Sequence, residues 1–249
     1  MIALRTSEEL KKLREAGRIS AGALKVAGES IKAGMSTKQL DDKMHKYILS
    51  QGAKPNFLGY NGFPGCACIS INDEVIHGIP SEQRKFQNGD IVSIDVGAIK
   101  DGYHGDNAYT FAVGNISSDA KKLLETTEKS LYEAIKVAKP GNRIGDISHA
   151  IQSTVEEQGF GVVREFVGHG VGKALHESPE IPNFGTAGRG IRLAEGMVIA
   201  IEPMINLVGA AIIHMPDGWT IKTKSGSLSA HFEHTIAITG DGAKILTKV

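Results

Sequence analysis

The sequence contains little that would place the protein in a membrane or on a nucleic acid. Its 249 residues carry 28 Lys and Arg against 28 Asp and Glu, so the formal net charge is zero. The basic surface that binds nucleic-acid phosphates is therefore not expected. No apolar run approaches the roughly 20 residues that span a bilayer. The first nine residues show no charged segment followed by an apolar core, so no signal peptide is predicted.

Cysteine is equally scarce. Cys66 and Cys68 are the only two cysteines, and a C-x-C pair without further thiols makes neither a disulfide framework nor a four-thiolate zinc site. We therefore expect reduced thiols on a strand and a cytoplasmic protein. Familiar catalytic motifs are missing too: there is no G-x-S-x-G elbow, and His176-Glu177 lacks the second histidine of an H-E-x-x-H zinc helix.

Two pairs of helices are predicted, one pair in each half of the chain. Thr6-x-x-Glu9 and Ser36-x-x-Gln39 have the form of capping boxes, and apolar residues at helical spacing follow each of them. The same spacing returns in the second half over two further segments, 118–139 and 144–158. Residues 57–115, and those from 161 onward, are rich in glycine and β-branched residues, which is typical of strands and hairpins.

This order suggests an internal repeat. A shift of 107 residues places Lys32 on Lys139, Gly34 on Gly141 and the strand after Gly89 on the strand after Gly196. Chance agreement of common residues at amphipathic spacing is the alternative to a duplicated unit of two helices and strands. The duplication predicts an α+β fold in which pseudo-two-fold symmetry relates the halves about a central antiparallel sheet. We expect one domain, 1–249, with half-repeats of about 8–115 and 116–249.

Four carboxylates fall on the strands that the repeat would bring to its axis. Asp95 is predicted to end one strand and Asp106 to begin the next, with a turn at 100–102 that lets the two strands pair. Glu202 and Glu233 repeat this arrangement in the second half. Each alone could be an ordinary carboxylate in a turn or a surface ion pair. Together they would repel one another and take up protons unless a cation neutralised them, so the pattern predicts a metal site.

His169, in the segment Gly168-His169-Gly170, is a candidate nitrogen ligand for that site, with a plain loop histidine as the alternative. Four carboxylates and one histidine offer enough donors for two divalent ions with bridging carboxylates. The absence of a thiolate ligand suits Mn, Fe, Co or Zn, and the spacing does not choose among them.

The chain resembles the type I methionine aminopeptidases over nearly its whole length. The matching segments are residues 70–80, Asp95 with Asp106, 168–172, His176-Glu177, 201–204 and 232–235. That family has the pita-bread fold, in which two similar halves surround a dinuclear metal site. The resemblance implies the same fold and a cytoplasmic metallopeptidase that removes the N-terminal methionine from nascent proteins and peptides with a small second residue.

The resemblance also implies roles for individual residues. The implied metal ligands are Asp95, Asp106, His169, Glu202 and Glu233. The implied catalytic residues are His77, His176 and Glu202: the two histidines contact the substrate and stabilise the oxyanion, and Glu202 is the general base. The pocket for the methionine side chain would be lined by Tyr60, Phe63, Cys68, Leu175 and Trp219. Some members carry an aromatic residue where this chain has Leu175, which concerns the shape of the pocket and not the metal site.

Two alternatives remain at the sequence level. Proline-specific aminopeptidases and prolidases share this fold and ligand set, but they usually carry a further N-terminal domain for which 249 residues leave no room. A non-catalytic pita-bread binding protein would have lost metal ligands, whereas all five are present. The implied partner is a polypeptide N-terminus, and the resemblance allows docking on the ribosome although no sequence feature indicates it. We expect a monomer without nucleic-acid specificity and without a membrane partner.

Overall fold

The computed structural model describes residues 2–248 and contains the two predicted pairs of helices. The first pair is α1 (Ser7–Ser30) and α2 (Thr37–Ser50), and both predicted capping boxes are present. The second pair is α3 (Ser118–Val137) and α4 (Ile144–Glu156). Both helices of this pair end two residues earlier than predicted; α3 stops before Lys139 because the residue ahead of Pro140 disfavours helical geometry. None of the helices described is long and apolar enough to cross a membrane.

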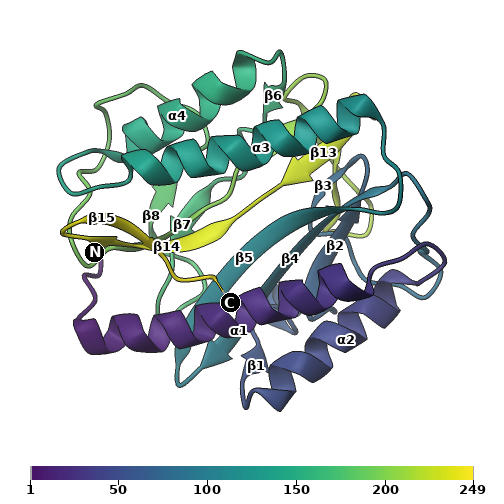
Figure 1. Cartoon of the computed structure of the whole chain (residues 1–249), viewed down its shortest axis with the longest axis horizontal. Helices are drawn as coiled ribbons and strands as arrows, with labels where there is room; N and C mark the ends of the chain where they lie inside the picture. Colours follow the sequence, from purple (N-terminus) through teal and green to yellow (C-terminus); the bar gives the residue numbers. More distant parts are fainter. Residues whose placement is uncertain (1, 249) are drawn as a thin grey trace.

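Each helix pair covers the strands of its own half, so the two pairs lie on either side of the strands in the view of Figure 1. Under the first pair, Ile19 and Met44 are fully buried against Ile94. Under the second pair, Leu131 and Ile151 pack in a core that contains strand residues of the second half. The apolar stripe of each helix, spaced at about 3.6 residues, is what buries it against a sheet.

The described strands form four antiparallel sheets. The first contains β1 (Lys54–Pro55), β2 (Ala67–Ile71), β4 (Ile91–Lys100) and β5 (Tyr103–Ala112). The second contains β7 (Gly168–Gly170), β8 (Glu177–Ile181), β9 (Val198–Ile201), β14 (His234–Thr239) and β15 (Gly242–Ile245). The two smaller sheets are formed by β6 (Gly161–Val162), β10 (Met204–Asn206) and β13 (Ser229–His231), and by β3 (Glu74–Ile76), β11 (Ile212–His214) and β12 (Ile221–Thr223).

The predicted repeat is confirmed at the level of strand pairing. Pro55 of β1 pairs with Ala98 of β4, and the residues 107 positions later, Val162 of β6 and Ile205 of β10, pair in the same way. Two isolated bridges obey the same shift, Ser36 with Lys85 and Arg143 with Arg192. Because the shift of 107 residues preserves the strand pairings as well as the residue types, the two halves share one structure. Chance agreement of residues at amphipathic spacing would not preserve the pairings.

The halves meet along β5, which lies beside β13 and β14. The amide of Glu233 donates to the carbonyl of Ala108 at 2.9 Å, and the hydroxyl of Thr235 donates to the carbonyl of Asp106 at 2.7 Å. The hydroxyl of Thr110 donates to the carbonyl of His231 at 2.8 Å. These bonds bring the carboxylate-bearing strands of the two halves together at the centre of the molecule.

The expected position of two carboxylates was wrong. Asp95 lies in the middle of the ten-residue β4, and Asp106 in the middle of β5. The strands continue because residues on both faces of β4 are buried, so the polar side chain interrupts the apolar run without ending the strand. Asp106 pairs with Gly97, two residues from Asp95 on the same face, so the carboxylates are diagonal neighbours. Glu202 and Glu233, by contrast, directly follow β9 and precede β14 as predicted.

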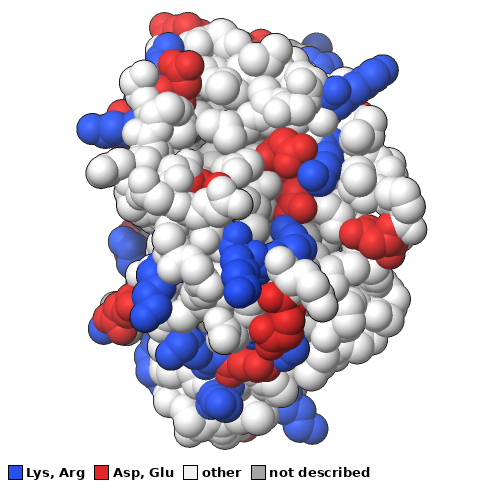
Figure 2. All heavy atoms as spheres, turned by 90° about the vertical axis from the view of Figure 1, so that its right-hand side faces the viewer, with Lys and Arg blue, Asp and Glu red and all other residues white. Residues whose placement is uncertain are grey.

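The outer surface carries charges of both signs. On the face shown in Figure 2, Lys and Arg side chains alternate with Asp and Glu without a large patch of either sign. This mixture agrees with the zero net charge and gives that face no basic track of the kind that follows a nucleic-acid backbone.

Candidate metal centre and active site

The five predicted ligand residues converge on one buried spot between the halves. Donor atoms of Asp106, His169 and Glu233 all lie within 4.8 Å of one another. Nε2 of His169 lies 3.8 Å from Oδ2 of Asp106 and 3.5 Å from Oε1 of Glu202. The Asp95 carboxyl is the diagonal neighbour of the Asp106 carboxyl across β4 and β5. Two donors therefore come from the first half of the chain and three from the second.

The glycines around His169 allow its strand to approach its neighbours closely. A Cβ on Gly168 would lie 2.4 Å from the carbonyl oxygen of Ala200, and one on Gly170 would lie 2.5 Å from that of Ser178. Nδ1 of His169 faces the carbonyl of Gly170 at 2.9 Å. The carbonyl can only accept, so Nδ1 carries the hydrogen and Nε2 presents its lone pair to the carboxylates, which is the form that binds metal.

A cation would stabilise the ionised form of the buried carboxyls in this cluster. Burial raises the pKa of Asp106 to about 7, and burial together with the neighbouring carboxylates raises the pKa of Asp95, Glu202 and Glu233 well above the usual range. Burial also lowers the pKa of His169 to about 4, so this imidazole stays neutral. One buried oxygen on each of Asp95, Asp106 and Glu233 has no hydrogen-bond partner among the described residues. Hard oxygen donors, a neutral imidazole and unpaired buried oxygens fit divalent metal ions.

An apolar cavity of ≈ 300 Å³ opens onto the carboxylate cluster. Its apolar end is formed by Phe57, Phe63, Cys68 and Leu175, with the Trp219 ring edge-on to Phe63 at 5.1 Å. Every residue for which the sequence predicted a role lines this cavity: Tyr60, Phe63, Cys68, His77, Asp95, Asp106, His169, Leu175, His176, Glu202, Trp219 and Glu233. The cavity thus joins an apolar side-chain pocket to a polar donor cluster.

Two histidines stand where the apolar and polar ends of the cavity meet. Nδ1 of His176 lies 2.8 Å from the hydroxyl of Tyr60. His77 has a positive φ of 60°, which is uncommon for a residue other than glycine, and its ring packs edge-on against Phe166 and Trp219. Burial lowers the pKa of His77 to about 4 and lowers that of His176, so both rings are neutral at pH 7.

The sequence analysis missed several residues of this site. His231 is buried, its Nε2 lies 3.6 Å from the second oxygen of Glu202, and that nitrogen has no hydrogen-bond partner among the described residues. The signal was present in His231-Phe232-Glu233, since alternate residues of an extended strand face the same side. Five further lining residues were also missed: Phe57, Asn61, Ile76, Phe166 and Val167. Of these, Ile76 lies inside the matching segment 70–80, and Phe166 and Val167 directly precede the segment 168–172.

A neutral imidazole among buried carboxylates, with a substrate-sized cavity beside it, defines a metal-dependent hydrolase. Comparisons with known proteins agree. The model of metallopeptidase family M24 matches residues 11–240. Over the full length of both chains the sequence is 54% identical to methionine aminopeptidase 1 of Bacillus subtilis. It is 44% identical to the methionine aminopeptidase of Escherichia coli, covering 99% of this chain and 94% of that one. The chain belongs to metallopeptidase family M24 and, within it, to the methionine aminopeptidases.

Solved structures place the fold in the same group. The crystal structure of methionine aminopeptidase from Thermotoga maritima matches with a TM-score of 0.99 and 46% identity, covering both chains completely. Prolidase from Pyrococcus furiosus is more distant, with a TM-score of 0.80 and 28% identity over 65% of its chain. The predicted pita-bread fold and metallopeptidase class are confirmed, and the prolidase alternative is supported only at a distance.

The stability of the metal-free protein is expected to fall as the pH rises. The buried carboxyls have higher pKa values in the folded chain than in the unfolded chain, with that of Asp106 raised from 3.8 to about 7. These carboxyls make the folded state bind more protons, whereas the buried histidines, with pKa values lowered to about 4 for His77 and His169, act in the opposite direction below about pH 6.5. The free energy of unfolding is therefore expected to decrease as the pH rises above about 6.5, where the histidines are neutral in both states and the carboxyls still hold protons only in the folded chain. Thermal unfolding of the chelated protein across this range measures the trend, and a saturating divalent ion should flatten it. A Tm that rises with pH would contradict the expectation.

Proposed function

We propose that this chain removes the N-terminal methionine from nascent proteins and peptides whose second residue is small. The observation that carries the proposal is the apolar cavity that ends at a buried cluster of four carboxylates and one histidine. An unbranched apolar side chain suits a pocket built from Phe57, Phe63 and Leu175. The relatives at 44–54% identity are named methionine aminopeptidases, which supports methionine as that side chain.

The donor set suits two divalent ions, which we propose are held by Asp95, Asp106, His169, Glu202 and Glu233. When bound, such ions supply Lewis acidity and a water molecule whose pKa is lowered towards neutrality. The oxygen-rich ligand set is compatible with Co, Mn, Fe or Zn. Four carboxylates carry four negative charges, which two divalent ions would neutralise at the centre of a protein whose net charge is zero.

The protein's own groups would move the protons. Glu202 is the proposed general base: its carboxylate borders the cavity and lies between the imidazoles of His169 and His231. It would take a proton from the attacking water and pass it to the leaving amine. Nδ1 of His176 faces the Tyr60 hydroxyl. If Nδ1 accepts that hydrogen, Nε2 carries the ring proton and can donate to the substrate oxygen as negative charge develops, with His77 on the same rim.

Chelation tests this proposal directly. Met-Ala-Ser should be cleaved by the metal-loaded protein, lose its cleavage after full removal of metal, and regain it when a divalent ion is restored. A dipeptide with proline in second position is the comparison substrate, because prolidases would favour it. Cleavage that survives metal removal would overturn the metallopeptidase mechanism, and faster turnover of the proline substrate would favour the prolidase alternative.

Several features stay predictions. We propose that residues 1–249 act as a single catalytic domain, because ligands from both half-repeats are needed to complete one centre. The free, buried thiols of Cys66 and Cys68 suit a reducing compartment such as the cytoplasm. Docking on the ribosome and a monomeric state also remain predictions. Size-exclusion chromatography with light scattering, and co-sedimentation with ribosomes, would measure these two.

A further inference from the structure

We propose that Arg5, in the segment ahead of α1, is a positioning residue for His176. Arg5 would act through Glu177, the residue that follows His176, and hold the loop 172–177 in the conformation that presents the imidazole to the substrate. The inference rests on the proposed function, since it is the oxyanion contact of His176 that the loop would position. Arg5 itself does not line the cavity.

The guanidinium of Arg5 makes an ion pair with Glu177 across 172 residues of sequence. Nη2 of Arg5 donates to Oε2 of Glu177. The Arg5 side chain is only 8% exposed and that of Glu177 is 20% exposed, so solvent screens this pair less than a surface pair. The amide of Arg5 donates to the carbonyl of Gly196 at 2.7 Å, which fixes its backbone beside the start of β9. Arg5 is therefore anchored to the second half of the chain at two points.

The second carboxylate oxygen of Glu177 binds the backbone at the start of the loop 172–177. Oε1 accepts the amide hydrogens of Lys173 at 2.8 Å and of Ala174 at 3.1 Å. One carboxylate thus joins the guanidinium of Arg5 to the beginning of the loop, while its own backbone starts β8 at the loop's end. Charge-assisted bonds of this kind are stronger than neutral ones, so loss of the arginine would weaken the whole arrangement.

The guanidinium of Arg5 packs directly against Gly172 of the loop. A Cβ at Gly172 would lie 1.9 Å from Nη2 of Arg5 and 2.5 Å from Oε1 of Glu177. The amide of His104 donates to the Gly172 carbonyl at 2.9 Å, which ties the loop to β5. The loop is therefore held by β5 on one side and by Arg5 on the other.

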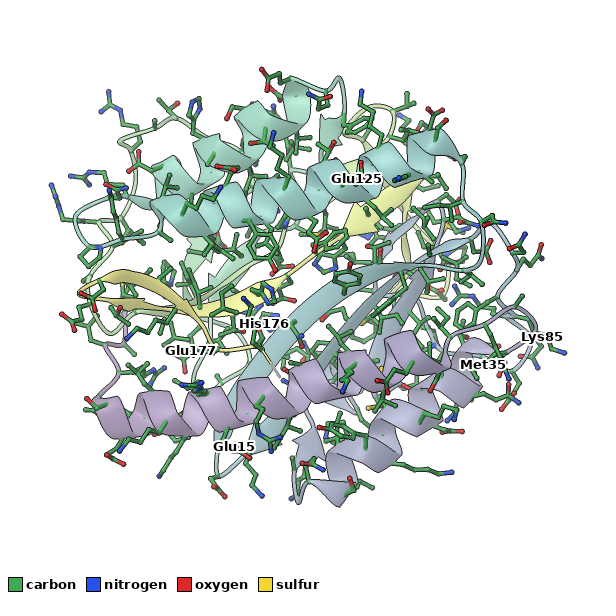
Figure 3. The ribbon with its side chains drawn as sticks, viewed as in Figure 1. Glu15, Met35, Lys85, Glu125, His176 and Glu177 are labelled. Atoms are coloured by element: carbon green, nitrogen blue, oxygen red, sulfur yellow. The ribbon has the colours of Figure 1, made fainter. Side chains whose placement is uncertain are left out.

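The side chain of His176 has few contacts of its own, the nearest ring being that of His169, whose centroid lies 4.2 Å from that of His176. The residue is exposed, and its side chain makes one hydrogen bond, to Tyr60, which is itself 38% exposed. In Figure 3, His176 and Glu177 lie between the two helix pairs, above α1 in that view. A displacement of about 1 Å in a group that contacts the transition state can cost about 100-fold in rate. Loosening the loop should therefore lower kcat far more than it raises KM, because Leu175 is the one residue of the apolar pocket that belongs to this loop.

The experiment compares four variants of the full chain with the wild type. Arg5→Ala removes the ion pair, Arg5→Lys keeps the charge, and Glu177→Gln keeps an acceptor for Lys173 and Ala174 without the charge. The control is Arg18→Ala, which removes the exposed pair with Glu15 on α1. The measurements are kcat and KM for Met-Ala-Ser, and hydrogen exchange of the amides in 172–178 in metal-free protein.

For Arg5→Ala we expect kcat to fall about 10- to 100-fold with KM within about twofold, and faster exchange in 172–178. Arg5→Lys should recover part of kcat, and Arg18→Ala should behave as the wild type. A kcat for Arg5→Ala equal to that of the control, or a change confined to KM, would overturn the proposal. If Arg5→Ala does not fold, Glu177→Gln decides by the same criteria. A wild type that does not cleave Met-Ala-Ser refutes the proposed function, and unchanged exchange in 172–178 then refutes the loop anchor separately.

Discussion

Replacing Glu202 by glutamine is expected to lower kcat for Met-Ala-Ser by about 10²–10⁴-fold, the usual contribution of a positioned general base, with KM changed little. The amide keeps the size of the side chain and an oxygen for metal binding, but it cannot accept a proton from water at neutral pH. Glu202 lies at the cavity with one oxygen 3.5 Å from Nε2 of His169 and the other 3.6 Å from Nε2 of His231. Steady-state kinetics at saturating metal measures the effect.

Glu195→Gln is the matched control for that substitution. Glu195 is an exposed glutamate shortly before β9, so the same chemical change is made away from the cavity and should leave kcat unchanged. Metal content is measured in both variants, because loss of a ligand would also lower turnover. A Glu202→Gln variant that retains its metal and its kcat, with only KM raised, would remove Glu202 as the base.

Replacing His169 by alanine is expected to weaken binding of the divalent metal at least 100-fold, since loss of a supporting group alone costs about 10- to 100-fold. The substitution removes the nitrogen donor predicted for the centre and leaves the carboxylates that lie around it. Turnover at low metal concentration should fall in parallel and recover in part when metal is added. Titration calorimetry of the chelated protein with Mn²⁺ measures the affinity without relying on activity.

His149→Ala serves as the control for that loss, because His149 is an exposed histidine on α4 with no part in the cavity. Circular dichroism of both variants confirms that the fold is kept. Equal Mn²⁺ affinity in His169→Ala and in the control would contradict the assignment of His169 as a ligand.

Local signals in the sequence predicted the helices and the repeat well. The capping boxes at Thr6 and Ser36 are present as predicted, because a cap depends on residues three positions apart. The repeat was visible because equivalent faces of the two halves meet equivalent environments. The strand limits around Asp95 and Asp106 were wrong, since a polar residue that ends an apolar run does not end a strand when its neighbours on both faces are buried.

The sequence predicted those site residues that the family resemblance identifies, and it missed others. All residues with a predicted role line one cavity. The metal ligands and the two histidines lie in the matching segments, and the five pocket residues, which lie outside those segments, were implied by the resemblance. His231 was missed although it stands two residues before Glu233. Its meaning depends on the unpaired nitrogen that points at Glu202, a contact between strands that neither segment reveals alone.

The amino-acid sequence by itself determined the helix starts, the duplicated order of elements and the set of residues that carry the chemistry. These follow from spacing along the chain, which sets caps, faces and register. Only the tertiary structure decided that four carboxylates share one buried spot with raised pKa values, and that Arg5 supports the loop of His176. The contacts that complete the site join residues of the two halves, and their geometry comes from the packing of one half against the other.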